Sequence, residues 1–284
     1  MPVQVQATLL TNKRVGSYHH LVMTGPDIAT GVRPGHFAAI AVGGPNTPMV
    51  LRRAFSIHRA SEMTAKGSVI ELVVSPHGPG SQWLTSQPVG SVIDVVAPLG
   101  KPFSLPRDPV SCLLVAGGYG SAPMAYLAEE LLKRGCQVDM IFGAATESKL
   151  FDVLECKRLA RYFETTTDDG SAGVKGRVSD VMPEMMQRGD TAVVYACGPM
   201  PMLQSVAKIA AAHGAVSQTA VEESMACGVG VCMTCVLPVI GDDGVTRMVR
   251  SCTEGPVFRG DRVRWDAVGT VPDDCLGAPV TGGH

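Results

Sequence analysis

Short apolar runs separated by turn signals occupy the first third of the chain. Six runs rich in β-branched residues show no helical period, and glycine- and proline-containing dipeptides separate them: VQVQATLL, HHLVMTG, HFAAIAV, AFSI, VIELVV and SVIDVVA. Strands at this spacing are typical of a small closed or sandwich-like antiparallel barrel. The pattern predicts such a barrel over residues 1–105, followed by a proline-rich linker in 98–109.

From Ser111 the pattern changes to strands that alternate with helices. The apolar strand SCLLVAGG precedes a helix that ends near Gly135, and the strand TAVVYACG precedes the amphipathic helix MPMLQSVAKIAAAHG. This alternation predicts a doubly wound parallel sheet over residues 106–220. Such sheets bind ligands beyond the carboxyl ends of their strands, which directs attention to the loops 117–123, 168–171 and 197–201.

The remaining chain follows neither pattern. Residues 221–265 form a glycine- and cysteine-rich segment that looks too short and irregular to carry its own hydrophobic core. Residues 266–284 are expected to be a flexible tail. The fold class is therefore an antiparallel barrel, then an α/β domain, then a small cysteine loop module.

Composition narrows the classes of function. The 284 residues carry 24 Lys plus Arg against 26 Asp plus Glu, which gives a net charge of −2. This charge balance does not indicate a basic surface of the kind that binds nucleic acid. No apolar run is long enough to cross a membrane, and the N-terminus has no signal-peptide pattern. We therefore expect a cytoplasmic protein. In that reducing compartment, nine cysteines favour metal or redox chemistry over disulfides.

Four of the cysteines have a spacing that predicts a metal centre. Cys227, Cys232 and Cys235 form C-x4-C-x2-C, and Cys252 follows. This spacing matches the plant-type pattern for a [2Fe–2S] cluster, and glycines inside the loop let backbone N–H groups turn toward the sulfurs. A zinc site of four cysteines is the structural alternative. The others lack this arrangement and are interpreted as packing residues or, in the tail, as incidental: Cys112, Cys136, Cys156 and Cys275.

Two glycine-containing loops of the α/β region are candidates for nucleotide binding. Gly117, Gly118 and Gly120 follow an apolar strand and precede a helix, where a phosphate can approach the backbone closely. A tight strand–helix turn would explain them equally well. Cys197-Gly198-Pro199 would place a thiol at the mouth of the same crevice, although a buried, inert cysteine is the simpler reading.

The barrel region contains two further candidate phosphate-binding elements. Arg53-Ala54-Phe55-Ser56 lies within a strand, and Gly80 and Ser81 lie where a short helix begins. An arginine binds phosphate by charge, and a helix N-terminus binds it by backbone donors. Taken alone, both also suit a surface arginine and an ordinary turn.

Taken in order, these motifs resemble a known family. R-x-F-S, G-x-G-S-x-x-L, G-G-x-G-x-A-P, C-G-P-M and the cysteine block resemble the ferredoxin–NADP reductase superfamily with an added [2Fe–2S] module. Within it, the segments TDDGSAGVKGRVSD and EESMACGVGVCMTC are most similar to the electron-transfer subunits of NAD-dependent dihydroorotate dehydrogenases. The resemblance covers residues 1 to about 265.

The resemblance implies FAD in the barrel domain, NAD in the α/β domain and a [2Fe–2S] cluster on the four cysteines. It assigns to FAD Arg53, Ala54, Phe55, Ser56, Val73, Val74, Ser75, Gly80 and Ser81. It assigns to NAD Gly117, Gly118, Gly120, Pro123, Asp168, Asp169, Gly170, Ser171, Cys197, Gly198 and Pro199. Ala54, Ser81 and Ala116 stand where the family usually has proline, threonine and the first glycine of the nucleotide loop, which are small changes. The loop HGPGS is richer in proline than the family pattern.

The resemblance also implies an oxidoreductase that acts with a partner chain and needs no acid–base residue of its own. Electrons would pass between NAD(H), FAD, the cluster and the FMN of a catalytic subunit that converts dihydroorotate to orotate in pyrimidine biosynthesis, in a heterotetramer with two copies of each chain. The alternative members are the small subunit of an NADH-dependent ferredoxin–NADP oxidoreductase, which tends to have aspartate in place of Cys227, and a sulfhydrogenase subunit. A non-enzymatic protein with a structural zinc is the alternative from a different class.

Overall fold

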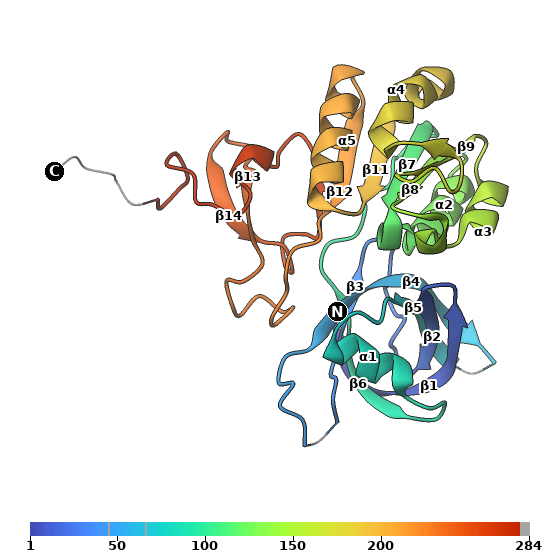
Figure 1. The fold of residues 1–284 in the computed structure, drawn as a ribbon. Coiled ribbons are helices and arrows are strands. Elements are labelled where there is room, and N and C mark those ends of the chain that lie inside the picture. The colour runs from blue at the N-terminus through green and yellow to red at the C-terminus, as the bar shows by residue number, and fades with distance from the viewer. Residues whose placement is uncertain (45, 66, 279–284) are drawn as a thin grey trace.

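The computed structural model describes residues 1–44, 46–65 and 67–278. The N-terminal part is a barrel, the middle part is a sheet covered by helices, and the C-terminal part is a hairpin module beside that sheet (Figure 1). Among the described residues, no helix combines the length and the apolarity that crossing a membrane requires.

The N-terminal part confirms the predicted antiparallel barrel. It closes in the order β1-β2-β5-β4-β3-β6, and all neighbouring strands are antiparallel. Alternate residues such as Leu21, Ile57 and Leu72 fill the interior and are fully buried, as the period of two in a strand requires. Leu84 of α1 (Pro79–Ser86) closes this core. The strands are β1 (Val3–Val15), β2 (Tyr18–Thr24), β3 (Phe37–Ile40), β4 (Arg53–Thr64), β5 (Gly67–Val74) and β6 (Val92–Leu99).

The middle part confirms the doubly wound sheet. Its strand order is β10-β9-β8-β7-β11-β12-β15, parallel except for β15, and the order reverses between β7 and β11. The strands are β7 (Ser111–Gly117), β8 (Gln137–Ala144), β9 (Phe163–Thr167), β10 (Val174–Lys175), β11 (Val193–Cys197), β12 (Val216–Ala220) and β15 (Val257–Arg259).

Helices cover both faces of this sheet, so two separate hydrophobic cores form. One core contains side chains of α2 (Met124–Lys133) and α3 (Val153–Leu159), and the other contains those of α4 (Val178–Gly189) and α5 (Met200–Ala212). Short 3-10 turns complete the elements: η1 (Gly118–Ser121), η2 (Glu147–Lys149) and η3 (Trp265–Ala267). Cys112, Cys136 and Cys156 are buried in the first core, as packing residues are expected to be.

The proline-rich linker is held between the barrel and the sheet. Phe103 packs edge-on against Tyr195 of β11, with ring centroids 5.5 Å apart. The Tyr195 hydroxyl donates a hydrogen bond to the Ser104 carbonyl at 3.0 Å, and the Phe103 N–H donates one to the Pro34 carbonyl at 2.9 Å. These contacts fix the position of the two domains relative to each other.

The C-terminal module contains a hairpin that sequence patterning did not predict. Strands β13 (Val236–Ile240) and β14 (Thr246–Arg250) pair antiparallel, and Leu237 joins the α4–α5 core. The module therefore uses the core of its neighbour, which agrees with the expectation that it has none of its own. Residues 266–278 differ from the expected flexible tail, because Cys275 is buried and pairs with Thr246 in a β-bridge. Residues 279–284 lie outside the described residues.

Candidate functional site

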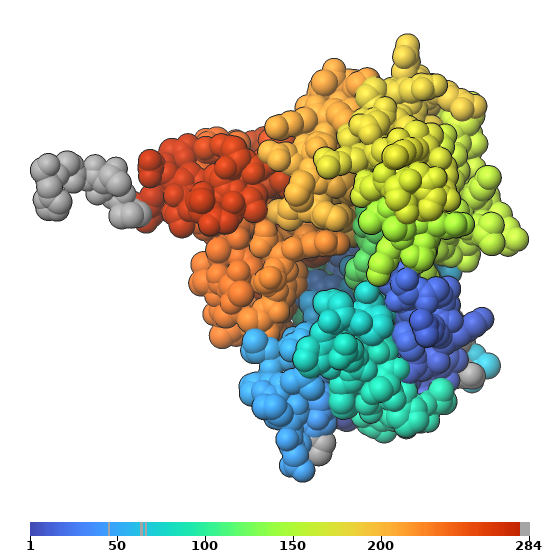
Figure 2. Space-filling view, in the orientation of Figure 1, coloured from blue at the N-terminus to red at the C-terminus, as the bar shows by residue number. Residues whose placement is uncertain are grey.

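A cavity of about 310 Å³ lies where the barrel, the sheet and the C-terminal module meet. The three parts surround a recess near the middle of the view in Figure 2. The barrel contributes Phe37, Ala54 and Ser56 to its lining, the sheet contributes the loop after β7 and Cys197, and the C-terminal module contributes residues 222–225. We call this space the central cavity.

The structure divides the arginine-containing motif of β4 between two environments. Ala54 and Ser56 face the central cavity, whereas Phe55, on the opposite side of the strand, is 8% exposed and packs inside the barrel. Arg53 lies beside Gly80, where an added Cβ would come within 2.9 Å of the Arg53 Nε. The guanidinium and the N-terminus of α1 are therefore adjacent, as a shared phosphate site requires.

Ser81 stabilises the turn that leads into α1. Its hydroxyl accepts hydrogen bonds from the backbone N–H groups of His77 and Gly78, each at 3.1 Å, and donates one to the Gly78 carbonyl at 3.1 Å. This serine therefore shapes the turn before α1 through the backbone. Val73 and Val74 are fully buried at the end of β5, and the Tyr119 hydroxyl donates a hydrogen bond to the Val73 carbonyl. Ser75 follows, and its carbonyl accepts the His77 N–H at 3.0 Å.

The glycines after β7 have two different roles. A Cβ on Gly120 would lie 2.1 Å from the Cys197 carbonyl oxygen, and a Cβ on Gly117 would lie 2.6 Å from the Met202 sulfur. These two glycines therefore allow the loops after β7 and β11 to pass in contact. Gly118 has φ +52° and no atom within 4 Å of an added Cβ, so its backbone is the part of the loop open to a ligand.

A second cavity, of about 610 Å³, lies beyond the carboxyl ends of β7, β8, β9 and β11. Gly117, Gly118, Pro199 and Asp168 line it, so the structure brings these sequence candidates together at the point where strand order reverses. Asp169, Gly170 and Ser171 form a turn beside it, in which the Ser171 N–H and hydroxyl both donate to Asp169 Oδ1, at 2.9 and 2.6 Å. Gly198 and Pro123 border the loops of this edge, and Pro123 lines the central cavity.

Arg177 is a lining residue of this second cavity that sequence analysis did not single out. It precedes α4, and its backbone N–H donates to the Asp180 carboxylate at 2.8 Å. A cationic side chain at a helix N-terminus favours anions such as phosphate. The lysine- and arginine-containing segment GVKGR was the available signal, but a charged residue in a loop is too common to stand out.

Cys197 lies in the wall of the central cavity and is 5% exposed. Burial, and then the negative charge of Glu222, raises the pKa of the Cys197 thiol well above its ordinary value. The side chain is therefore a neutral thiol at pH 7, which suits a packing or contact role and not that of a nucleophile.

The four cysteines of the predicted metal centre lie around one loop. The sulfurs of Cys227 and Cys232 are 3.4 Å apart, while Cys235 and Cys252 are 1% and 2% exposed. The Ser251 N–H donates to the Cys235 carbonyl at 2.8 Å, which ties the end of β14 to the loop. Inside the loop, Gly228 and Gly230 have φ +71° and +83°.

The surroundings of these sulfurs fit a thiolate-ligated metal group. Although slight burial opposes ionisation of Cys227, backbone N–H groups of Cys232, Val229 and Val231 lower its pKa to about 6. Burial, and then the adjacent Cys235, raise the pKa of Cys252 to about 12. Crowded sulfurs beside N–H donors are stabilised when a cation binds them as thiolates.

One wall separates the cysteine loop from the central cavity. Phe37 lines the cavity and also packs in the small hydrophobic cluster that contains Cys235 and Cys252. Met225 likewise lines the cavity and packs against that cluster. Single side chains therefore form the barrier between a ligand in the cavity and the sulfurs.

Two parts of the chain match known families. Residues 222–264, which include all four cysteines of the loop, match the iron-sulfur cluster binding domain of dihydroorotate dehydrogenase B, and residues 114–208 match the oxidoreductase NAD-binding domain. The first match favours the [2Fe–2S] cluster over the zinc alternative.

Comparison with solved structures agrees with this fold. The structure of an NADH-dependent reduced ferredoxin–NADP oxidoreductase superposes with a TM-score of 0.78 at 26% identity, covering 92% of this chain and 90% of the other. A ferredoxin NADP⁺ reductase from Neisseria gonorrhoeae shares the fold of 75% of this chain and 92% of the other, with a TM-score of 0.58 at 16% identity.

Curated relatives match over nearly their whole length. Proteins named dihydroorotate dehydrogenase B (NAD(+)), electron transfer subunit, are 34% identical in Desulforamulus reducens and 36% identical in Geobacillus thermodenitrificans. The matches cover 87% and 86% of this chain and 93% and 92% of the relatives. The barrel, the parallel sheet and the cysteine loop also follow one another in the expected order. The chain therefore belongs to the family of dihydroorotate dehydrogenase B electron-transfer subunits.

Proposed function

We propose that this chain relays electrons between NAD(H) and a partner subunit that converts dihydroorotate to orotate in pyrimidine biosynthesis. The observation that supports this most strongly is the wall formed by Phe37 and Met225, because it places the central cavity next to the cysteine loop. FAD in the central cavity would exchange a hydride with nicotinamide and single electrons with a [2Fe–2S] cluster on Cys227, Cys232, Cys235 and Cys252.

The barrel residues would bind and orient the flavin. Arg53 and the N-terminus of α1, with Gly80 leaving room for close approach, would hold the pyrophosphate, while Ser81 shapes that loop. Ala54 and Ser56 would contact the ring system in the cavity, and the end of β5 (Val73, Val74, Ser75) would support it. The ring of Phe55 would not contact the flavin but would pack in the barrel core behind β4.

The edge of the parallel sheet would hold NAD. The backbone at Gly118 and the side chain of Arg177 would face its phosphates, and Asp168 would border the site. Cys197 lines the central cavity beside the loop after β7. A nicotinamide would stack on the flavin at this place. Its neutral thiol offers a small, water-excluding contact at that place.

The partner would dock on the exposed side of the cysteine loop. Val231 and Met233 are 82% and 60% exposed although they are apolar, and they flank Cys232 on either side. Exposed apolar side chains at one place mark an interaction surface. We propose an FMN-containing catalytic subunit at this surface, two copies of each chain in the complex, and a cytoplasmic location, where the nine free cysteines are kept reduced.

The direct test mixes this chain with a candidate catalytic subunit, dihydroorotate and NAD⁺ under anaerobic conditions. We expect orotate and NADH to form in equal amounts, and neither to form when either chain is left out. A complex that forms without NAD-dependent orotate production would refute the assigned partner. The matched control is Cys235→Ser, which should still reduce its flavin with NADH but should produce no orotate.

A second candidate is the small subunit of an NADH-dependent ferredoxin–NADP oxidoreductase, because a structure of that enzyme superposes closely on this chain. Family members of that type tend to have aspartate where this chain has Cys227, so the complete set of four cysteines favours the dihydroorotate system. Reduction of NADP⁺ that requires both NADH and reduced ferredoxin, in place of orotate formation, would support this second candidate.

A further inference from the structure

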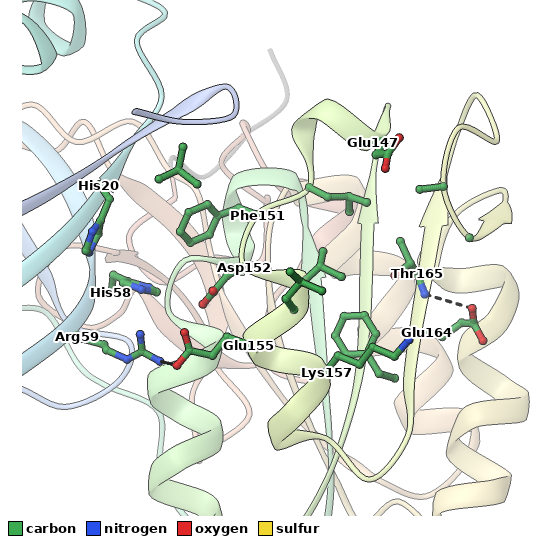
Figure 3. Close-up of a pocket in the computed structure, with 17 residues that line it drawn as sticks. His20, His58, Arg59, Glu147, Phe151, Asp152, Glu155, Lys157, Glu164 and Thr165 are labelled. Atoms are coloured by element: carbon green, nitrogen blue, oxygen red, sulfur yellow. Dashed lines mark hydrogen bonds and ion pairs between the residues drawn. The ribbon is translucent and has the colours of Figure 1, made fainter. Parts of the chain in front are cut away.

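A third cavity lies on the seam between the barrel and the α/β domain, away from both sites above. Its volume is about 800 Å³, and the residues that line it come from β1, β2, β4, the segment 147–157, β9 and residues 172–173 (Figure 3). It shares no lining residue with the central cavity or with the second cavity, at the edge of the parallel sheet. We call it the seam cavity, and the proposed electron relay does not use it.

Three potential metal ligands meet on the barrel side of the seam cavity. His20, Glu71 and His58 lie on β2, β5 and β4, which are neighbours in the barrel. Their sequence neighbours Leu21, Leu72 and Ile57 point into the core, so the alternation of a strand directs all three side chains outward. The pairing of β4 with β5 shifts register between Ile57 and Arg59, and such a bulge redirects the side chain between them.

The potential ligand atoms of these three residues are close enough for one ion. All lie within 4.8 Å of one another. Zinc binds imidazole nitrogen and carboxylate oxygen at about 2.0–2.2 Å, so two ligand atoms of one ion are about 3–4 Å apart. A small adjustment of side-chain torsions therefore completes the geometry. His20 Nε2 and Glu71 Oε2 are 2.7 Å apart in a hydrogen bond that the ion would replace.

The hydrogen bond of His58 prepares its ring for a metal. Its Nδ1 faces the carbonyl oxygen of Ala122, which can only accept a hydrogen bond. Nδ1 must therefore carry the proton, and Nε2 carries the lone pair. Metal-binding histidines are commonly oriented in this way, with the second nitrogen donating to a backbone carbonyl. His58 is only 4% exposed, so its orientation is fixed by packing.

The α/β domain supplies a fourth candidate ligand. Asp152 precedes α3, and Figure 3 shows its carboxylate on the side of the seam cavity where His20 and His58 lie. Its Oδ2 is buried and has no hydrogen-bond partner among the described residues. A buried carboxylate oxygen without a donor is costly, and a cation removes that cost. The neighbouring Arg59 does not serve this purpose, because it pairs with Glu129 and Glu155 at 2.9 and 2.6 Å.

We propose that His20, His58 and Glu71 bind one divalent metal ion of the zinc type, and that Asp152 completes the shell from the opposite domain. Two imidazoles and two carboxylates neutralise a divalent charge and make a closed four-ligand site, which is the arrangement of a structural metal. Because its ligands come from both domains, the ion fixes the barrel relative to the sheet. Binding to the folded state alone also stabilises the protein by mass action.

Zinc binding is measured on the anaerobic holoprotein, with its flavin and cluster in place, by titration calorimetry. Iron and acid-labile sulfide are assayed before and after, so that zinc on the four cysteines is recognised. We expect one zinc ion per chain, and a zinc X-ray absorption spectrum with a nitrogen and oxygen shell and no sulfur. Zinc with sulfur neighbours, or no uptake by intact holoprotein, would overturn the proposal.

Ligand variants separate this site from nonspecific binding. His58→Gln and Glu71→Gln should each weaken zinc binding by more than the 10- to 100-fold that loss of a second-shell contact costs. The matched control is His213→Gln, because His213 is exposed at the end of α5, far from the seam in sequence. Flavin content and NADH-driven ferricyanide reduction show that each variant is folded. Equal zinc affinity in His58→Gln and His213→Gln would contradict the assignment.

Asp152 has a closely matched control within the chain. Asp190 is also an aspartate with positive φ, +49° against +60° for Asp152, but it is exposed at the end of α4. Asp152→Asn should lower zinc affinity, and Asp190→Asn should leave it unchanged. Equal affinities of the two variants would remove Asp152 from the ligand set. The same measurements on variants with an intact cluster keep this result independent of the electron relay.

Discussion

The cysteine loop and the edge of the parallel sheet reach their functional geometry in different ways. Residues 221–235 form no helix or strand, and they are held by backbone hydrogen bonds and by a few apolar contacts, such as those of Met225 and Cys235. The loops at the sheet edge follow fully buried strands such as β7 and β11 and are fixed by glycine contacts. We therefore expect the cysteine loop to depend on its metal for order, whereas hydrophobic burial builds the sheet edge before any ligand arrives.

The largest expected effect comes from removing one sulfur. Cys235→Ser should lose the [2Fe–2S] cluster and reduce NAD-dependent orotate formation by more than the ~100-fold that a lost outer-shell contact costs. NADH-driven ferricyanide reduction should persist, because the flavin and the sheet edge remain. Cys275→Ser, a buried cysteine of the same region outside the loop, is the control and should keep the cluster. Equal iron content in the two variants would contradict the ligand assignment.

The next effect tests the sheet edge. In Gly120→Ala the new Cβ would lie 2.1 Å from the Cys197 carbonyl, so the two loops must separate. Overpacking of this kind costs about 1–3 kcal/mol, and we expect a raised KM for NADH together with a lower melting temperature. Gly118→Ala has open space and meets only backbone strain, so its melting temperature should fall less. A larger loss in Gly118→Ala would show that strain, not contact between the loops, sets this geometry.

Removal of the cluster should change the local stability of the cysteine loop but not that of the parallel sheet. In cluster-free Cys235→Ser protein, amide hydrogen exchange should accelerate in residues 225–235, which lack regular structure. Exchange in β7, β8 and β11 should stay slow, since their stability comes from the cores between sheet and helices. Uniform acceleration throughout the sheet would mean that the two regions fold as one unit.

The smallest effect concerns thiol reactivity. Although slight burial opposes ionisation, backbone N–H groups of the loop lower the pKa of Cys227 to about 6. Cluster-free protein that keeps this loop conformation should therefore be alkylated about 10-fold faster at pH 7 than at pH 5. Loss of the loop conformation should remove that difference. Cys197 should remain unreactive over the same range, because its pKa is raised and it is buried. Mass spectrometry after iodoacetamide treatment measures both. Rapid alkylation of Cys197 would contradict its placement in the cavity wall.

Sequence patterning predicted the features that depend on neighbouring residues. The cysteine spacing, the six barrel strands and the strand–helix alternation are local in sequence, so they could be read directly. The hairpin β13–β14 was missed, because its alternation is weak and includes Pro238 within the first strand. The roles of Gly117 and Gly120 could not be predicted either, since the atoms that they approach belong to a loop about 80 residues away in the sequence.

The three potential ligands at the seam cavity could not be predicted from the sequence either, because they too are distant from one another in the chain. His20, His58 and Glu71 come from three strands, and their meeting depends on the barrel order and on the bulge near His58. Neither the spacing of these residues nor their type indicates a site, and a solitary histidine in a strand is more often a packed or surface residue. Only the register of the strands brings them together.

The central claim is that a cavity-bound flavin and the four-cysteine cluster exchange electrons across the wall of Phe37 and Met225. The most direct measurement adds NADH to the isolated holoprotein under anaerobic conditions and records low-temperature electron paramagnetic resonance spectra. The account predicts the signal of a reduced [2Fe–2S] cluster in the wild-type chain and its absence in Cys235→Ser. A bleached flavin with a cluster that stays oxidised, although dithionite reduces it, would contradict the claim.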